Sequence, residues 1–103
     1  MTSYTREEEA LDDFLAKQDG VVAVVYSEPF HPGSESLANR ARSLGEQTGK
    51  HVIVVGPESH RTWAAHHGVF GTPAMLVFRN GNLVQRLHGV LPESQLIEFA
   101  TRW

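Results

Sequence analysis

The sequence contains no cysteine among its 103 residues. Without thiols, these residues form no disulfide, hold no metal through thiolates and carry out no thiol redox chemistry. A surplus of positive charge is also missing, because 9 basic and 12 acidic side chains give a formal net charge of -3. Nucleic-acid binders normally gather basic residues on one face, so the charge balance argues against that class.

Long apolar runs are missing as well. No stretch approaches the roughly 18–20 apolar residues that a membrane-spanning helix needs. The first ten residues carry three consecutive glutamates and no apolar stretch, so we expect no secretory signal and a cytoplasmic location. Because a domain typically has roughly 150 residues, we expect residues 1–103 to form a single domain.

The first half of the chain alternates helical and extended patterns. Thr5 and Glu8 fit a capping box at a helix start, and apolar residues follow at helical spacing: Ala10, Leu11, Phe14 and Leu15. Residues 21–26 (VVAVVY) are apolar without alternation, which predicts a strand covered on both faces. A proline-rich loop at residues 27–33, a helix from its N-cap Ser34 to Gly49, and a buried strand at residues 51–55 complete a parallel βαβ unit.

The second half changes to an antiparallel pattern. Residues 58–67 predict a short helix with Trp63 and Ala64 facing inward. Two strands, at residues 74–78 and 83–88, flank Asn80-Gly81, and an Asn-Gly pair is a strong signal for a two-residue hairpin. A last helix starts at Pro92. The predicted order is therefore α-β-α-β-α-β-β-α.

Four stretches in this order resemble the thioredoxin family, and the resemblance covers nearly the whole chain. Residues 22–33 are similar to the family's first core strand and active-site loop, with YSEPFHPG at residues 26–33 in place of WAxWCGPC. Residues 68–73 (GVFGTP) resemble the segment ending in the family's cis-proline, residues 76–81 (LVFRNG) its hairpin, and residues 88–89 its last turn. The resemblance implies a thioredoxin-like three-layer α/β/α sandwich, with a mixed four-stranded sheet and four helices.

The departures from the family pattern remove its chemistry. Phe30 and Gly33 occupy the positions of the two family cysteines, and disulfide exchange requires one thiolate to attack and a second sulfur to resolve the intermediate. Val24 aligns with the family's buried acid and Val54 with the lysine that faces it. The resemblance therefore implies a redox-inactive member and no redox enzyme.

Pro73 has two interpretations. The resemblance makes Thr72-Pro73 a cis bond, and in relatives this geometry lets the preceding residue present its backbone to an extended peptide, as in strand addition. Alternatively, Pro73 only shapes the turn into the hairpin.

Phe30 and Phe70 also have two interpretations each. Phe30 lies at the tip of a loop ahead of a helix, where an aromatic ring could anchor a partner. We favour instead that Phe30 folds back onto Pro73 and Trp63 as core filling. Phe70 has the same two interpretations, and the two rings together could form an apolar patch.

The remaining polar residues suggest no metal, cofactor or hydrolytic site. Two of the six histidines, His60 and His67, lie two helical turns apart, roughly 10 Å, which is too far for one ion without other ligands. His31 and Glu28 are two ligands only, and we interpret the histidines as solvated. The glutamates at residues 7–9 are interpreted as favourable first-turn charges against the helix dipole.

The function predicted from these observations is a non-enzymatic protein- or peptide-binding module, a chaperone or assembly factor. Its predicted binding residues lie on the former redox face: Pro29, Phe30, His31, Pro32, Gly33, Phe70, Gly71, Thr72, Pro73, Gly89 and Val90. A narrower resemblance, in residues 68–78 and 89–97, is to the cysteine-lacking HyaE/HupG-type hydrogenase-maturation proteins, and it implies a chaperone of the hydrogenase small subunit. Two alternatives remain: a disulfide-independent enzyme using His31 or Ser34, and a homodimer formed through the apolar patch.

Overall fold

The computed structural model describes residues 4–89 and Ser94. In these residues the elements follow in the predicted order: α1 (Arg6–Lys17), β1 (Val21–Tyr26), α2 (Pro32–Thr48), β2 (His51–Val55), α3 (Pro57–His66), β3 (Ala74–Arg79) and β4 (Asn82–His88). The helix predicted from Pro92 and the site residue Val90 lie outside the described residues. No helix of the described part is long and apolar enough to cross a bilayer.

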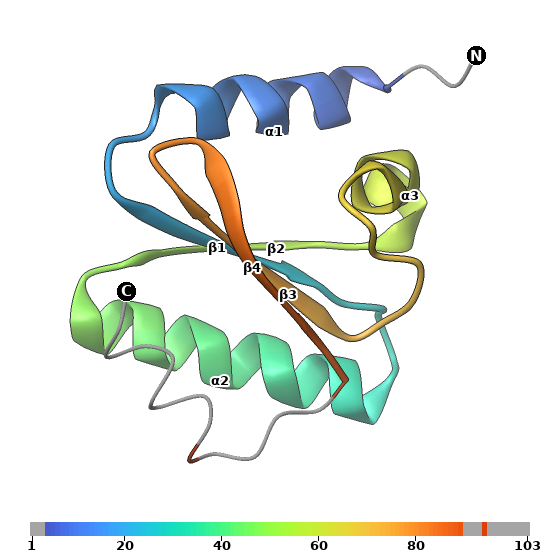
Figure 1. The fold of residues 1–103 in the computed structure, drawn as a ribbon. Coiled ribbons are helices and arrows are strands. Elements are labelled where there is room, and N and C mark those ends of the chain that lie inside the picture. Colours follow the sequence, from blue (N-terminus) through green and yellow to red (C-terminus); the bar gives the residue numbers. More distant parts are fainter. Residues whose placement is uncertain (1–3, 90–93, 95–103) are drawn as a thin grey trace.

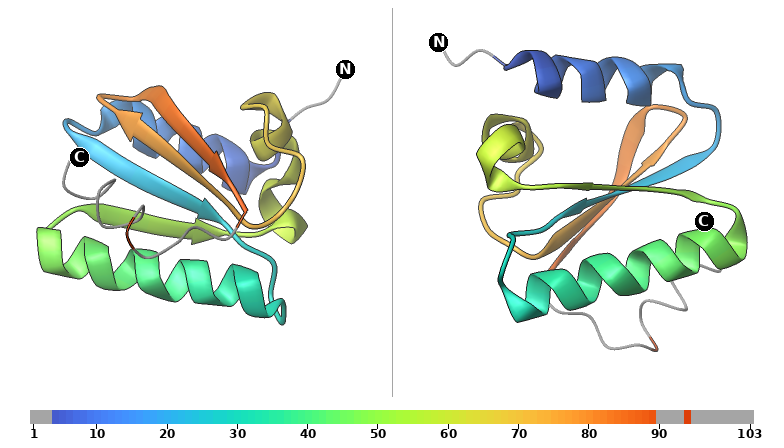
Figure 2. Two further views of the ribbon diagram at one scale, coloured as in Figure 1. Left: turned by 60° about the horizontal axis from the view of Figure 1, so that its bottom comes forward. Right: turned by 180° about the vertical axis from the view of Figure 1, so that it is seen from behind.

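The four strands form one sheet in the order β2-β1-β3-β4. β1 pairs parallel with β2 and antiparallel with β3, and β3 pairs antiparallel with β4. Helices α1 and α3 cover one face of this sheet and α2 covers the other (Figures 1 and 2). The predicted mixed α/β sandwich is therefore confirmed.

The core has two halves, one on each face of the sheet. Because successive strand residues point to opposite faces, Val22, Val24 and Tyr26 of β1 join the half under α1 and α3, whereas Ala23 and Val25 join the half under α2. All five are buried, which confirms that residues 21–26 form a strand covered on both faces. The strand β2 was predicted to be buried too, but it lies at the sheet edge and is half-buried.

The helix starts differ in how well the sequence predicted them. The capping box of α1 is present, with Thr5 and Glu8 bonding each other's backbone N–H groups, although Ala10 is exposed on this helix. For α2 the prediction of Ser34 as N-cap is wrong. The helix begins two residues earlier at Pro32, and the cap is His31, whose Nδ1 accepts the backbone N–H of Ser34.

The hairpin between β3 and β4 turns at Asn80 and Gly81, as predicted. Both residues have positive φ, 52° and 84°, which the two-residue hairpin turn requires and which asparagine and glycine tolerate best. The side chain Oδ1 of Asn80 accepts the backbone N–H of Gly20 at 2.7 Å. The turn is thereby tied to the segment that leads into β1.

Candidate functional site

The predicted site residues gather where four chain segments meet at one end of the sheet. In the sheet ladder Tyr26, the last residue of β1, pairs with Val55 on one side and Ala74 on the other. The loop after β1 and the loop before β3 therefore leave the sheet side by side, at the right of Figure 1. Gly89, after β4, joins them because its N–H donates to the carbonyl of Pro73 at 2.9 Å.

We call the surface made by residues 27–31, residues 67–73 and Gly89 the loop face. The first loop, residues 27–31, connects β1 to α2, and the second loop, residues 67–73, connects α3 to β3. Pro32 and Gly33 continue the first loop as the first two residues of α2.

Phe30 points away from the core, which corrects the favoured prediction that it fills the core. Its side chain is 93% exposed. Its backbone has φ = 63°, a left-handed conformation that non-glycine residues rarely adopt. The N–H of Phe30 donates to Oε1 of Glu35 at 3.2 Å, and the N–H of His31 donates to the carbonyl of Glu28.

Phe70 is exposed as well, to 83%, between two buried residues of the second loop. Val69 anchors the loop in the core under α1 and α3, and Pro73 is buried next to β3. The peptide bond between Thr72 and Pro73 is cis. Val69 and Pro73 thus hold the second loop against the core, while the ring of Phe70 is exposed to solvent.

A hydrogen bond joins the two loops across 44 residues of sequence. The hydroxyl of Thr72 donates to Oε2 of Glu28 at 3.1 Å. Glu28 was considered in the sequence only as a weak metal ligand, and no sequence signal indicated this bond. Because of it, the loops that carry Phe30 and Phe70 are held together at the middle of the loop face.

The positions that the resemblance aligns with family chemistry are apolar in the structure. Val24 is fully buried among the residues under α1 and α3, and Val54 packs on the α2 side. Ser34 was considered as a nucleophile beside His31. Its Oγ is fully buried without a hydrogen-bond partner in the described residues, and its backbone rather than its hydroxyl contacts the imidazole.

A buried carboxylate is nevertheless present, and it comes from α1. Glu8, 1% exposed, accepts the backbone N–H groups of Trp63 and Thr5, and Asp12 accepts the indole N–H of Trp63 at 2.6 Å. Burial raises the pKa of the Glu8 carboxyl, but the hydrogen bonds from Thr5 and Trp63 outweigh it, so its pKa lies below the ordinary value. This cluster fastens α1 to α3 and reaches the start of the second loop, because Oδ1 of Asp12 lies 3.9 Å from Nε2 of His67.

Four of the six histidines are exposed, as predicted, whereas His60 and His67 are not; the exposed ones are His31, His51, His66 and His88. His60 is buried, and its Nδ1 lies 2.6 Å from the hydroxyl of Ser59. His67 is half-buried against the rings of Trp63 and Phe78, and burial lowers its pKa although Asp12 nearby raises it. Within residues 4–89 and Ser94, no group of three or more His, Asp or Glu side chains is arranged to hold a metal ion.

Two cavities border the loop face. The smaller, of about 320 Å³, has Ser27 and Pro29 of the first loop in its lining. The larger has a volume of about 510 Å³ and lies between the second loop and α3, lined by Tyr26, Glu28, Pro57, Arg61, Ala65, Val69, Phe70, Gly71 and Thr72. This volume is within the range of natural ligand sites.

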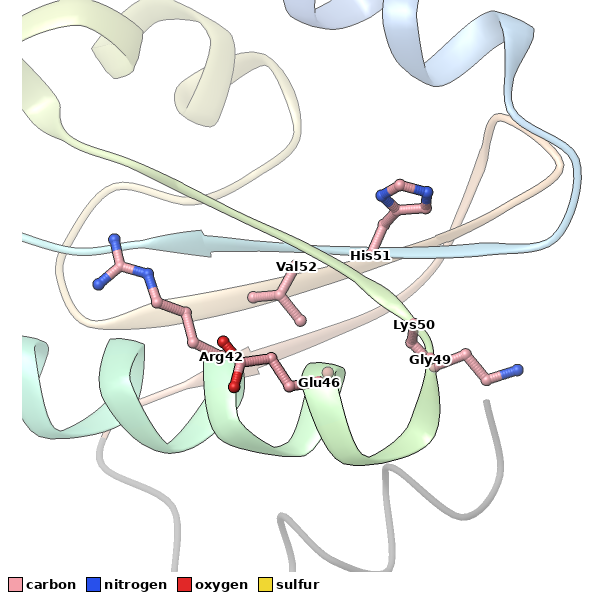
Figure 3. Close-up of a pocket in the computed structure, with 7 residues that line it drawn as sticks. Arg42, Glu46, Gly49, Lys50, His51 and Val52 are labelled. Carbon is pink, nitrogen blue, oxygen red and sulfur yellow. The ribbon is translucent and has the colours of Figure 1, made fainter.

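A third cavity, of about 410 Å³, lies at the far end of α2 (Figure 3). Its charged residues Arg42, Glu46, Lys50 and His51 do not converge on one point, because Lys50 and His51 point away from the other two. The cavity of about 510 Å³ beside the second loop is therefore a better candidate for a binding site than the cavity at the end of α2.

No protein-family model and no curated protein sequence matches the chain. Solved thioredoxin structures do match. A mutant thioredoxin from Halobacterium salinarum NRC-1 superposes with a TM-score of 0.77 and 20% identity, over 100% of this chain and 87% of that one. The thioredoxin of Fasciola hepatica gives 0.75 and 20%, over 91% and 88% of the two chains, and that of Plasmodium falciparum gives 0.77 and 18%, over 92% of each.

These matches show that the chain has the thioredoxin fold. None of the 103 residues is a cysteine, so they supply neither of the sulfurs that thiol–disulfide exchange uses. The chain has a thioredoxin-like fold without the thiols of that chemistry, and its loop face exposes backbone, two aromatic rings and a few polar groups.

Proposed function

We propose that the chain is a protein-binding module, a chaperone or assembly factor, that holds an extended segment of a partner protein across the loop face. The observation that carries this proposal is the pair of bare phenylalanine rings, Phe30 and Phe70, on two loops joined by the hydrogen bond between Thr72 and Glu28. The predicted binding residues from Pro29 to Gly33, from Phe70 to Pro73, and Gly89 all belong to this face or border it.

The exposure of these rings is the reason for expecting a partner. Single exposed apolar side chains are common on proteins and need no explanation. Here, however, two of the three large apolar side chains exposed in the described residues lie on one face, and the third, Val84, lies on β4. Aromatic rings dominate the energy of protein interfaces because each buries a large apolar area with few rotatable bonds.

The spacing of the rings suits one extended segment. Each phenylalanine is two residues from the Glu28–Thr72 bond that joins the loops. Two residues reach about 7 Å at most, and the Glu28 and Thr72 side chains with their hydrogen bond add about 10 Å, so the Cα atoms of the two phenylalanines lie within roughly 25 Å of each other. An extended segment of about eight residues spans that distance.

Space for the partner's backbone is available at Gly71. No atom outside its neighbouring residues lies within 4 Å of where a Cβ of Gly71 would be, in the part of the chain that the structure describes. A segment lying there would pass Thr72, whose backbone would pair with it by strand addition. The proposed contacts are thus backbone pairing at Thr72 and apolar contact with the two rings.

Replacing Phe70 by serine tests the proposal. Short peptides from a random displayed library are selected on the immobilised protein, and a signal peptide of a hydrogenase small subunit is tested beside them because of the narrower resemblance. Their affinities are measured by fluorescence anisotropy. We expect Phe70→Ser to weaken binding about tenfold or more, because a partly buried aromatic contact is lost. Its melting temperature should stay within about 4 °C of wild type, because the side chain is exposed.

Val84→Ser is the matched control, since it removes an exposed apolar side chain 56% exposed on β4 and outside the loop face. We expect the selected peptides to bind this variant as tightly as wild type. Failure to select any binding peptide, or equal losses in Phe70→Ser and Val84→Ser, would contradict the proposal.

A further inference from the structure

We propose that the cavity beside the second loop is a pocket for one tyrosine side chain of the bound segment. The inference rests on the proposed function and adds to it the chemistry of the partner. It is carried by the walls of the cavity, which are apolar at the sides and bear one negative and one positive group.

The apolar walls fit an aromatic ring. They come from three elements: Tyr26 at the end of β1, Pro57 and Ala65 of α3, and Val69 and Phe70 of the second loop. Because Phe70 is 83% exposed, one wall of the cavity is a ring with an uncovered surface. A partner's ring beside it would gain an aromatic contact, which contributes about 0.5–1.5 kcal/mol beyond the area buried.

The charged walls are Glu28 and Arg61. Thr72 donates to Oε2 of Glu28, and a carboxylate has about four acceptor positions, so it can take a further donor. Arg61 is exposed on α3 and contributes a guanidinium group that only donates. The cavity wall therefore presents one hydrogen-bond acceptor, Glu28, and one donor, Arg61, and their opposite charges sum to zero.

This pair of opposite charges selects against charged side chains. A lysine or arginine side chain would be attracted by Glu28 but repelled by Arg61. An aspartate or glutamate side chain would be attracted by Arg61 but repelled by Glu28. A neutral tip that both donates and accepts satisfies both walls. Tyrosine has such a hydroxyl at the end of an aromatic ring. Phenylalanine has no polar group there, the indole N–H of tryptophan only donates, and serine is too small to fill the cavity.

The hydroxyl of Tyr26 shows that both charges act within this region. Burial raises the pKa of Tyr26, Arg61 lowers it, and Glu28 and Glu8 each raise it, with a net increase. Both charged groups are thus close enough to the buried ring at the cavity wall to influence a phenol there.

The position of the cavity also agrees with the proposed path of the segment. Thr72 and Gly71 line the cavity and belong to the second loop along which the segment would pair. Side chains of an extended segment alternate between two sides. When one residue faces the Phe30 side of the loop face, its neighbour faces the cavity, so a single residue of the partner is expected to enter it.

Capped host peptides of the form Ser-Thr-Val-X-Val-Thr-Ser, with X as Tyr, Phe, Lys, Asp or Ala, test the pocket. Their affinities for the full chain are measured by fluorescence anisotropy. We expect the tyrosine peptide to bind about tenfold more tightly than the phenylalanine peptide, since hydrogen bonds to charged groups provide that difference. The lysine and aspartate peptides should bind no better than the alanine peptide.

Two variants assign the preference to the cavity. Ala65→Leu fills it from α3 and should abolish the advantage of tyrosine and phenylalanine over alanine, whereas Ala10→Leu, at an exposed position of α1, should leave all affinities unchanged. Arg61→Leu removes the donor and leaves the Glu28 acceptor, so it should reduce the preference for tyrosine over phenylalanine and let the lysine peptide bind more tightly, while phenylalanine binds as before.

The outcomes separate this inference from the proposed function. If all host peptides bind with equal affinity and Phe70→Ser weakens them all, the loop face binds segments but the tyrosine pocket is wrong. If none binds, and the displayed library also yields nothing, the proposed function fails. If the tyrosine peptide keeps its full advantage over the phenylalanine peptide in both Ala65→Leu and Arg61→Leu, its ring binds outside this cavity and the inference is overturned.

Discussion

Replacing Glu8 by glutamine is expected to lower the free energy of unfolding by about 2–3 kcal/mol, which lowers the melting temperature by roughly 10–20 °C for a domain of this size. The carboxylate is fully buried and accepts two backbone N–H groups, those of Thr5 and Trp63. Glutamine keeps one acceptor oxygen but places an amide N–H₂ opposite the other donor. One buried donor is then left without a partner.

The effect of this substitution depends on pH in a defined direction. The pKa of Glu8 in the folded protein lies below its ordinary value of 4.5, so the folded state binds the proton less readily than the unfolded state. The stabilisation is complete above 4.5 and is lost as the pH falls through the lower pKa of the folded state. The difference in unfolding free energy between wild type and Glu8→Gln should therefore be constant above about pH 5 and shrink below it.

Glu9→Gln is the control for this prediction. Glu9 neighbours Glu8 in the first turn of α1 but is exposed, and its replacement should change the unfolding free energy by less than about 0.5 kcal/mol. Denaturant unfolding of the three proteins across the acid range measures both effects. Equal stabilities of Glu8→Gln and Glu9→Gln at neutral pH would show that the buried carboxylate does not fasten α1 to α3.

Replacing Phe30 by glycine is expected to change stability and binding in opposite directions. Phe30 has φ = 63°, a conformation that costs a non-glycine residue about 1 kcal/mol and glycine very little. Its exposed ring contributes little to the core. We expect the unfolding free energy to rise by about 0.5–1 kcal/mol and the affinity for selected peptides to fall about thirtyfold, as for a central aromatic contact.

Phe30→Ser separates the two effects. Serine keeps the unfavourable φ but loses the ring, so its stability should equal that of wild type while its affinity falls as in Phe30→Gly. Thermal unfolding and anisotropy on the same preparations measure both quantities. A glycine variant that binds as tightly as wild type would contradict the role of this ring in binding.

The sequence predicted those parts of the fold that depend on neighbouring residues. The unbroken apolar run at residues 21–26 predicted the central strand, and Asn80-Gly81 predicted the hairpin with both residues at positive φ. The start of α2 was predicted two residues late because Ser34 is a common N-cap. Pro32, a residue favoured in the first turn, was the better signal.

The site depends on contacts between residues that are distant in the sequence, and these contacts could not be predicted from local patterns. The bond between Glu28 and Thr72 joins residues 44 positions apart, and the burial of Glu8 depends on Trp63, 55 positions away. Neither pairing leaves a local pattern. The capping box singled out Glu8 among the glutamates at residues 7–9, but nothing local indicated that it is also buried against Trp63. Whether Phe30 packs inward depends on the backbone conformation of one loop residue, which composition does not determine.

The pairing of Tyr26 with Ala74 has a consequence for recognition. The two loops leave the sheet from the same rung of the ladder, so their separation is determined by strand register. A one-residue slip would move every side chain of β1 to the opposite half of the core. Under the proposed function, a partner therefore binds a surface whose two loops are already held at a set distance from each other. The loops then lose little conformational entropy when the partner binds. The spacing of apolar residues along the partner segment decides which segments fit.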